Sequence, residues 1–263
     1  MTATRVAVTE PGSESEKGRP EQRRNDDVVD DRLERLRLAI AEHPGTQADT
    51  RWSRLRRTHA LLASNLRELS RLIDRPEGDS WLALDLVSNT GSHNAAQEAF
   101  FDEFDRLLHN AVAAIGTLID HTRIVARHYE GSRFHDEYGR RIGNVAVLPA
   151  ARFVKDLRNY MLHRSLPAPY SQVDLHPQQV SYQLLISVPA LLEFSAWSAA
   201  SREYLASHGS MLPIREPLDE YAAAIDDLYE WMFTQSAQLD VAHIEAANAL
   251  IDEYNDVLIG RRE

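Results

Sequence analysis

The sequence contains no cysteine among its 263 residues. A disulfide, a thiolate metal site and a cysteine nucleophile are therefore excluded, and nothing indicates an oxidising compartment.

Long apolar runs are also missing. The longest strongly apolar stretch, residues 111–119, is far shorter than the roughly 20 residues that a membrane-spanning helix needs. Residues 1–31 hold no apolar segment of the kind found in secretory signals, so we expect a soluble, cytoplasmic protein without a membrane segment.

Positive charge is scarce overall, because the net charge is −11. This balance argues against nucleic-acid binding through a uniformly positive surface. The charge is unevenly distributed, however. Residues 121–164 contain nine Lys or Arg against four Asp or Glu, so this segment alone carries +5. A local basic patch in an acidic protein is typical of a phosphate-handling site, but it also describes an ordinary solvated helix face.

The apolar pattern predicts a mainly all-α fold, a multi-helix bundle. Residues 1–30 are polar and poor in aliphatic side chains, so we expect a disordered tail, followed by a single helical domain over residues 31–263. Apolar residues at spacings of three and four predict helices over residues 31–43, 49–74, 92–129, 150–165, 189–208, 216–237 and 241–259. Residues 81–87 and 131–149 are expected to be loops. Partial alternation over 170–175 and 180–184 predicts one small β-hairpin, about 170–188.

The helix predicted over residues 150–165 carries the polar side chains of most interest. At 100° per residue, Val154, Leu157 and Met161 form its buried stripe. Other side chains lie opposite that stripe, at its edge or on its flank: Arg152, Lys155, Asp156, Arg158, Asn159 and His163. Arg158 and His163 are about 140° apart, so one ideal helix does not direct both at the same atom. Histidine exchanges protons near neutral pH and arginine holds phosphate through a planar fork, so the pair suits phosphoryl chemistry without a metal.

The stretch Arg158-Asn159-Tyr160-Met161-Leu162-His163 resembles the motif of the HEPN superfamily: an arginine, a polar residue that is often asparagine, and a histidine a few positions later. The resemblance is sharp over residues 154–167 and looser over the surrounding bundle. It implies a compact all-α protein that forms a homodimer and acts as a metal-independent ribonuclease in a toxin, phage-defence or RNA-processing system. A toxin subgroup has tyrosine two residues after the histidine, where this chain has Ser165, so we do not place it there.

The resemblance also implies roles for the motif residues. His163 would transfer a proton or position the substrate, Arg158 would stabilise the phosphate or transition state, and Asn159 would orient them. The implied reaction is attack of an RNA 2′-hydroxyl on the adjacent phosphate, with the two motif copies meeting across a dimer interface. A basic patch for RNA is expected from nearby cations: Arg152, Lys155, Arg164, Arg140 and Arg141. The hairpin and C-terminal helices are additional to a minimal bundle of this superfamily.

Metal and cofactor sites are not expected. His121, His128 and His135 recur every seven residues, but along a helix they lie about 10 Å apart, too far for one ion. Nucleotide-binding glycine loops and a hydrolase serine elbow are absent from the sequence. The alternative function is non-catalytic: a helical interaction module, such as an antitoxin-like partner or a scaffold, in which the motif is degenerate or incidental. The overall acidity favours this alternative, because RNA would approach a negative field.

Overall fold

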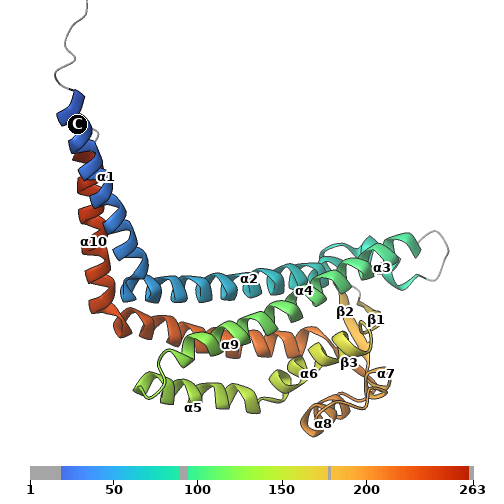
Figure 1. Ribbon diagram of the computed structural model, residues 1–263. Coiled ribbons are helices and arrows are strands. Elements are labelled where there is room, and N and C mark those ends of the chain that lie inside the picture. The colour runs from blue at the N-terminus through green and yellow to red at the C-terminus, as the bar shows by residue number, and fades with distance from the viewer. Residues whose placement is uncertain (1–18, 89–93, 177–178, 261–263) are drawn as a thin grey trace, which may run out of the picture. The chain divides into compact units, whose positions relative to one another are not determined.

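The computed structural model describes residues 19–88, 94–176 and 179–260 (Figure 1). Within these ranges it contains ten helices and three short strands, so the predicted mainly α-helical fold is confirmed. The chain divides into two compact units, one formed by residues 1–49 and 240–263 and the other by Thr50–Leu239, where the sequence suggested a single domain over 31–263. Each unit has its own packing.

The first unit is a pair of packed helices, α1 (Arg19–Glu42) and α10 (Val241–Gly260). Leu33, Leu36 and Ala247 are buried. Gly45 lies so close to α10 that a Cβ at this position would overlap the carbonyl oxygen of His243. Residues 19–30, which fall in the expected tail, belong to α1, and residues 1–18 lie outside the described residues.

The second unit holds the remaining elements. They are, in chain order, α2 (Pro44–Gly78, from Thr50 onward), α3 (Ser80–Val87), α4 (Asn94–Arg127), α5 (Arg133–Val147), α6 (Pro149–His163), β1 (Pro169–His176), β2 (Gln179–Ser187), α7 (Val188–Leu192), α8 (Ala199–Ser207), β3 (Met211–Pro213) and α9 (Arg215–Leu239). Pro149 occupies the first turn of α6, where its missing N–H costs no hydrogen bond. Helix α6 packs against α4, α5, α8 and α9, so the motif helix is embedded in the unit.

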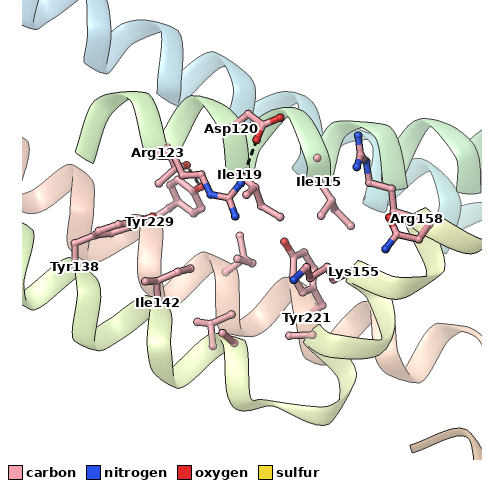
Figure 2. Close-up of a pocket in the computed structure, with 17 residues that line it drawn as sticks. Ile115, Ile119, Asp120, Arg123, Tyr138, Ile142, Lys155, Arg158, Tyr221 and Tyr229 are labelled. Atoms are coloured by element: carbon pink, nitrogen blue, oxygen red, sulfur yellow. Dashed lines mark hydrogen bonds and ion pairs between the residues drawn. The ribbon is translucent and has the colours of Figure 1, made fainter. Parts of the chain in front are cut away.

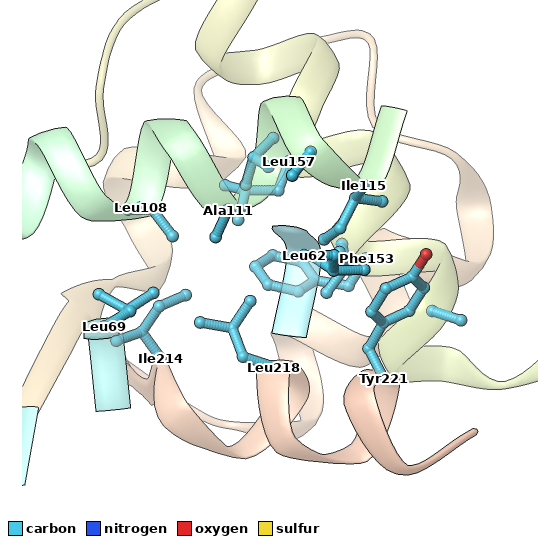
Figure 3. Close-up of a cluster of buried hydrophobic side chains, with 14 of the residues drawn as sticks. Leu62, Leu69, Leu108, Ala111, Ile115, Phe153, Leu157, Ile214, Leu218 and Tyr221 are labelled. Atoms are coloured by element: carbon cyan, nitrogen blue, oxygen red, sulfur yellow. The ribbon is translucent and has the colours of Figure 1, made fainter. Parts of the chain in front are cut away.

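The core of this unit forms where α2, α4, α6 and α9 meet. Figure 3 shows Leu62 and Leu69 of α2 beside Leu108 and Ile115 of α4, all at most 2% exposed. Phe153 and Leu157 of α6 and Leu218 and Tyr221 of α9 complete the cluster. Burying each large aliphatic or aromatic side chain contributes about 1.5–3 kcal/mol, so this cluster fixes the position and rotation of α6.

Two predicted loops are helices in the structure. Residues 81–87 lie in α3, whose first turn is capped by the Asp79 carboxylate accepting from the N–H of Leu82 at 3.1 Å. Residues 133–147 form α5, although Gly139 and Gly143 lower its intrinsic helix propensity. An apolar stripe that includes Phe134 packs this helix against α9 and outweighs that cost.

The predicted helix over 189–208 is instead two helices. Helix α7 ends at Leu192 and α8 begins at Ala199. The break is held by the indole N–H of Trp197, which donates to the Leu191 carbonyl at 2.6 Å, and by Ser198, whose hydroxyl accepts from the N–H of Ser201 at 3.3 Å. These side-chain bonds satisfy backbone groups that a continuous helix would pair internally.

The predicted hairpin is confirmed and has a third strand. Strands β1 and β2 pair antiparallel, with Val173 opposite Tyr182. Strand β3 adds to the other edge of β2, with Leu212 opposite Ile186. Only three residues long, β3 is too short for an alternating pattern to be read from the sequence.

Candidate anion-binding site at the motif helix

A cavity of about 260 Å³ lies among α4, α5, α6 and α9 (Figure 2). Its walls are mostly apolar. Ile115 and Ile119 come from α4, Ile142 from α5 and Ile225 from α9. A concave apolar surface with a few convergent polar groups is the usual form of a ligand site.

Three cations line the cavity. Arg123 comes from α4 and is paired with Asp120 at 3.4 Å. Lys155 and Arg158 come from α6, are exposed, and form no ion pair with any residue in the described ranges. Lys155 and Arg158 are therefore available to an anion.

Arg158 reaches from α6 across to α4, where Gly116 leaves room for it (Figure 2). A Cβ at position 116 would lie 2.7 Å from the Arg158 Nε, closer than real Cβ atoms approach other atoms. Gly116 itself is buried. Because Gly116 has no side chain, the Arg158 guanidinium can lie against α4 at this position.

Tyrosines add polar atoms to the apolar walls. The Tyr221 side chain is 4% exposed, and its hydroxyl points into the cavity (Figure 2). Within the described part of the chain this hydroxyl has no hydrogen-bond partner, whereas the Tyr229 hydroxyl bonds to Thr122. Burial raises the pKa of Tyr221 and of Tyr138 above the ordinary value, so both phenols are neutral donors at physiological pH.

The structure places the three motif residues in two different settings. Arg158 and Asn159 both line the cavity. His163, the last residue of α6, is exposed and does not line it. It lies one helical turn beyond Asn159, a rise of about 6 Å. A ligand that contacts all three residues must therefore extend out of the cavity along α6.

Two of the cations expected to bind RNA, Arg140 and Arg141, instead pair with Glu137 on α5. Arg140 donates to both carboxylate oxygens of Glu137, at 2.8 and 2.6 Å, and Arg141 donates to one of them at 2.7 Å. These guanidinium groups lower the pKa of Glu137 to about 2. Arg141 also lies over the Trp231 ring, 4.7 Å from its centroid. Neither arginine lines the cavity.

Arg152 and Arg164 do not line the cavity either. The Arg152 Nε donates to the Ala146 carbonyl at 2.9 Å. Arg164 pairs with Glu193 at 3.2 Å just beyond the end of α6. Of the five cations in the expected patch, the structure therefore brings only Lys155 to the cavity, where Arg123 and Arg158 join it.

Asp156, expected on the polar face of α6, holds the start of α8. Its Oδ2 accepts from the backbone N–H of Ser198 at 2.9 Å and from the Ser201 hydroxyl at 2.7 Å. Burial by itself would raise the pKa of Asp156, but these hydrogen bonds and the positive charge of Lys155 outweigh it, so the pKa is lowered. This carboxylate is a structural acceptor and is not aimed into the cavity.

Aromatic stacking fixes α6 from the other side. The Trp197 ring stacks on Phe153, with centroids 5.6 Å apart, and on Tyr160, with centroids 5.7 Å apart. All three side chains are at most 5% exposed. Phe153 precedes the motif and Tyr160 lies within it, both on the buried side of α6. Their stacking therefore fixes the direction of the exposed face of α6.

The sequence did not single out Gly116 or Tyr221. A lone glycine inside a helical pattern weakly indicates close packing, and Gly116 is such a glycine. Nothing in the sequence indicated a site at Tyr221, because a tyrosine in an apolar stripe is ordinarily a core residue. Arg123 was counted in the basic segment, but nothing along the sequence indicated that it would line the same cavity as Lys155 and Arg158.

Comparisons with known proteins found no matching family model, no similar curated protein and no similar solved structure. Across residues 19–88, 94–176 and 179–260, no group of three or more His, Asp or Glu side chains is arranged to hold a metal ion. In the same ranges no helix is both long and apolar enough to cross a membrane. The functional argument therefore rests on the motif and on the geometry around it.

Proposed function

We propose that the Thr50–Leu239 unit is a HEPN-like, metal-independent endoribonuclease that binds an RNA phosphate with Arg158 and cuts the adjacent bond with His163. The observation that carries this proposal is the position of Arg158 and Asn159 at a cavity that Lys155 also lines, with neither Arg158 nor Lys155 in an ion pair within the described ranges. An arginine binds a phosphate through two parallel N–H···O bonds, and a neighbouring lysine adds a second positive charge.

The chemistry needs only side chains of this chain. The 2′-oxygen of the ribose attacks phosphorus while the bond from phosphorus to the 5′-oxygen breaks, which leaves a cyclic phosphate and a free 5′-hydroxyl. His163 exchanges the protons that this transfer moves, because imidazole is suited to proton transfer near neutral pH. Arg158 stabilises the charge that develops on the phosphate oxygens, and Asn159 orients the phosphate between them.

The separation of His163 from the cavity favours a homodimer in this proposal. One ideal helix turns Arg158 and His163 about 140° apart, so a two-fold pairing of α6 copies would bring the arginine of one subunit toward the histidine of the other. A single RNA strand that leaves the cavity along α6 also reaches His163, because the residue is exposed. In both arrangements Arg158, Asn159 and His163 carry out the reaction.

The test is cleavage of a pool of structured cellular RNA in EDTA by the purified protein, beside His163→Ala. We expect cutting by the wild type that survives chelation and is lost in the variant. His109→Ala is the matched control, because His109 is an exposed histidine on α4 that does not line the cavity. Equal cutting by wild type and His163→Ala would refute the proposed role. Absence of cutting by both would favour the interaction module.

A further inference from the structure

A second depression, of about 290 Å³, lies between α2 and α4. Arg51, Arg54 and Arg57 of α2 and His121 of α4 line it, and no acidic residue does. Arg54 and Arg57 are exposed. Within the described ranges none of the three arginines forms an ion pair, and the Arg51 Nε is buried without an acceptor.

This basic groove is separate from the cavity at the motif helix. Ile119 lines the cavity and His121 lines the groove, and at 100° per residue they are about 200° apart around α4. The two sites therefore lie on opposite sides of the same helix.

The floor of the groove is fixed by hydrogen bonds. The Thr58 hydroxyl donates to the Arg54 carbonyl at 3.0 Å, and its oxygen accepts from Nδ1 of His121 at 2.8 Å. Thr58 is 7% exposed. Arg54 and Arg57 lie three residues apart on α2, about 4.5 Å apart along the helix axis.

We propose that this groove is a second polyanion site, which binds the phosphate backbone of single-stranded RNA outside the reacting centre. The concentration of unpaired arginines is unexpected in a chain of net charge −11, where most cations on the same surface would find an acid. Arginine side chains are the usual donors to backbone phosphates. The choice of RNA as the polyanion rests on the proposed function, whereas the affinity of the groove for phosphates does not.

The test measures binding of a fluorescent 2′-O-methyl oligonucleotide of about 20 nucleotides, longer than typical single-strand sites, at several salt concentrations. This probe cannot be cut by 2′-hydroxyl attack, so binding is measured apart from cleavage. The groove variant is Arg54→Gln with Arg57→Gln, both at exposed positions. Each lost phosphate contact lowers the slope of log affinity against log salt by about 0.7, so we expect a slope smaller by about 1.4 and a lower affinity.

The matched control is Arg67→Gln with Arg71→Gln on the same helix. These arginines line a different depression, together with Asp74, Asp219 and Asp226, which disfavour a phosphate there. We expect the control to keep the wild-type slope. Equal slopes for the groove and control variants would overturn the proposal. An acidic protein would then be the favoured partner of the groove.

The two proposals fail separately. A reduced slope in the groove variant, with no RNA cutting by the wild type, would support the groove and refute the ribonuclease. Cutting that requires His163, with an unchanged slope in the groove variant, would support the ribonuclease and refute the groove.

Discussion

Gly116 leaves the space on α4 that the Arg158 side chain occupies, and this contact offers a test that separates function from stability. Replacing Gly116 with alanine places a methyl group 2.7 Å from the Arg158 Nε. Because the clash falls on the flexible side chain of a partly solvated arginine, the fold accommodates it while the guanidinium moves. Alanine also favours the helix over glycine by about 0.5–1 kcal/mol.

We therefore expect Gly116→Ala to lower RNA affinity while its midpoint of thermal unfolding stays level or rises. Gly139→Ala is the control, because a Cβ at this exposed helical position meets nothing within 4 Å. The control should gain stability and keep wild-type affinity. Unchanged RNA binding in Gly116→Ala would mean that the position of Arg158 does not matter.

At the residue scale the sequence identified the site in part. Arg158 and Asn159 were found from the motif and do line a cavity. Gly116 and Tyr221 were not found, because their importance comes from contacts across helices that lie 40 or more positions apart in the chain. Arg140 and Arg141 were expected at the site, but the local spacing that made them a basic patch also places them beside Glu137.

At the scale of elements, α8 depends on a carboxylate from α6. Asp156 accepts two hydrogen bonds at the start of α8, where backbone N–H groups have no partner within the helix. We expect Asp156→Ala to lower the free energy of unfolding by about 1 kcal/mol at pH 7, as removal of a helix cap does.

This contribution should depend on pH. The pKa of Asp156 is lower in the folded protein than in the unfolded chain, so its stabilisation is fully present above the ordinary aspartate value of about 4 and disappears as pH falls through the lowered pKa. Urea unfolding of wild type and Asp156→Ala from pH 7 to pH 3 measures this difference. Asp227→Ala, at an exposed position of α9, should change stability little at any pH. A difference that is as large at pH 3 as at pH 7 would contradict the assignment.

The elements themselves were predictable where apolar spacing was long and regular, as in α4, α9 and the motif helix. Helix α5 was missed because its two internal glycines suggested a loop, whereas packing of Phe134, Tyr138 and Ile142 at four-residue spacing stabilises the helix. Strand β3 was missed because its pairing with β2 is a long-range contact. Both errors arise where tertiary packing outweighs local propensity.

At the scale of the whole molecule, charge would limit how the proposed RNA substrate binds. The chain carries −11, so a strand approaches favourably only where cations are free of acids. The basic groove between α2 and α4 is lined by no acidic residue. The cavity at α6, on the opposite side of α4, is lined by Asp120, which pairs with Arg123, and by Lys155 and Arg158, which form no ion pair in the described ranges. The division into two compact units was not predictable from the sequence, because no linker-like stretch separates residues 49 and 50 or 239 and 240.

The measurement that tests the central claim most directly is the rate at which wild type and Arg158→Ala cut the same RNA in EDTA. We predict cutting by the wild type and a rate about 10²–10³ lower in the variant, the usual cost of removing one preorganised donor to a developing negative charge. Both proteins should unfold at the same temperature, since Arg158 is exposed. Equal rates in the two proteins would contradict the assignment of the motif helix as the site of RNA cleavage.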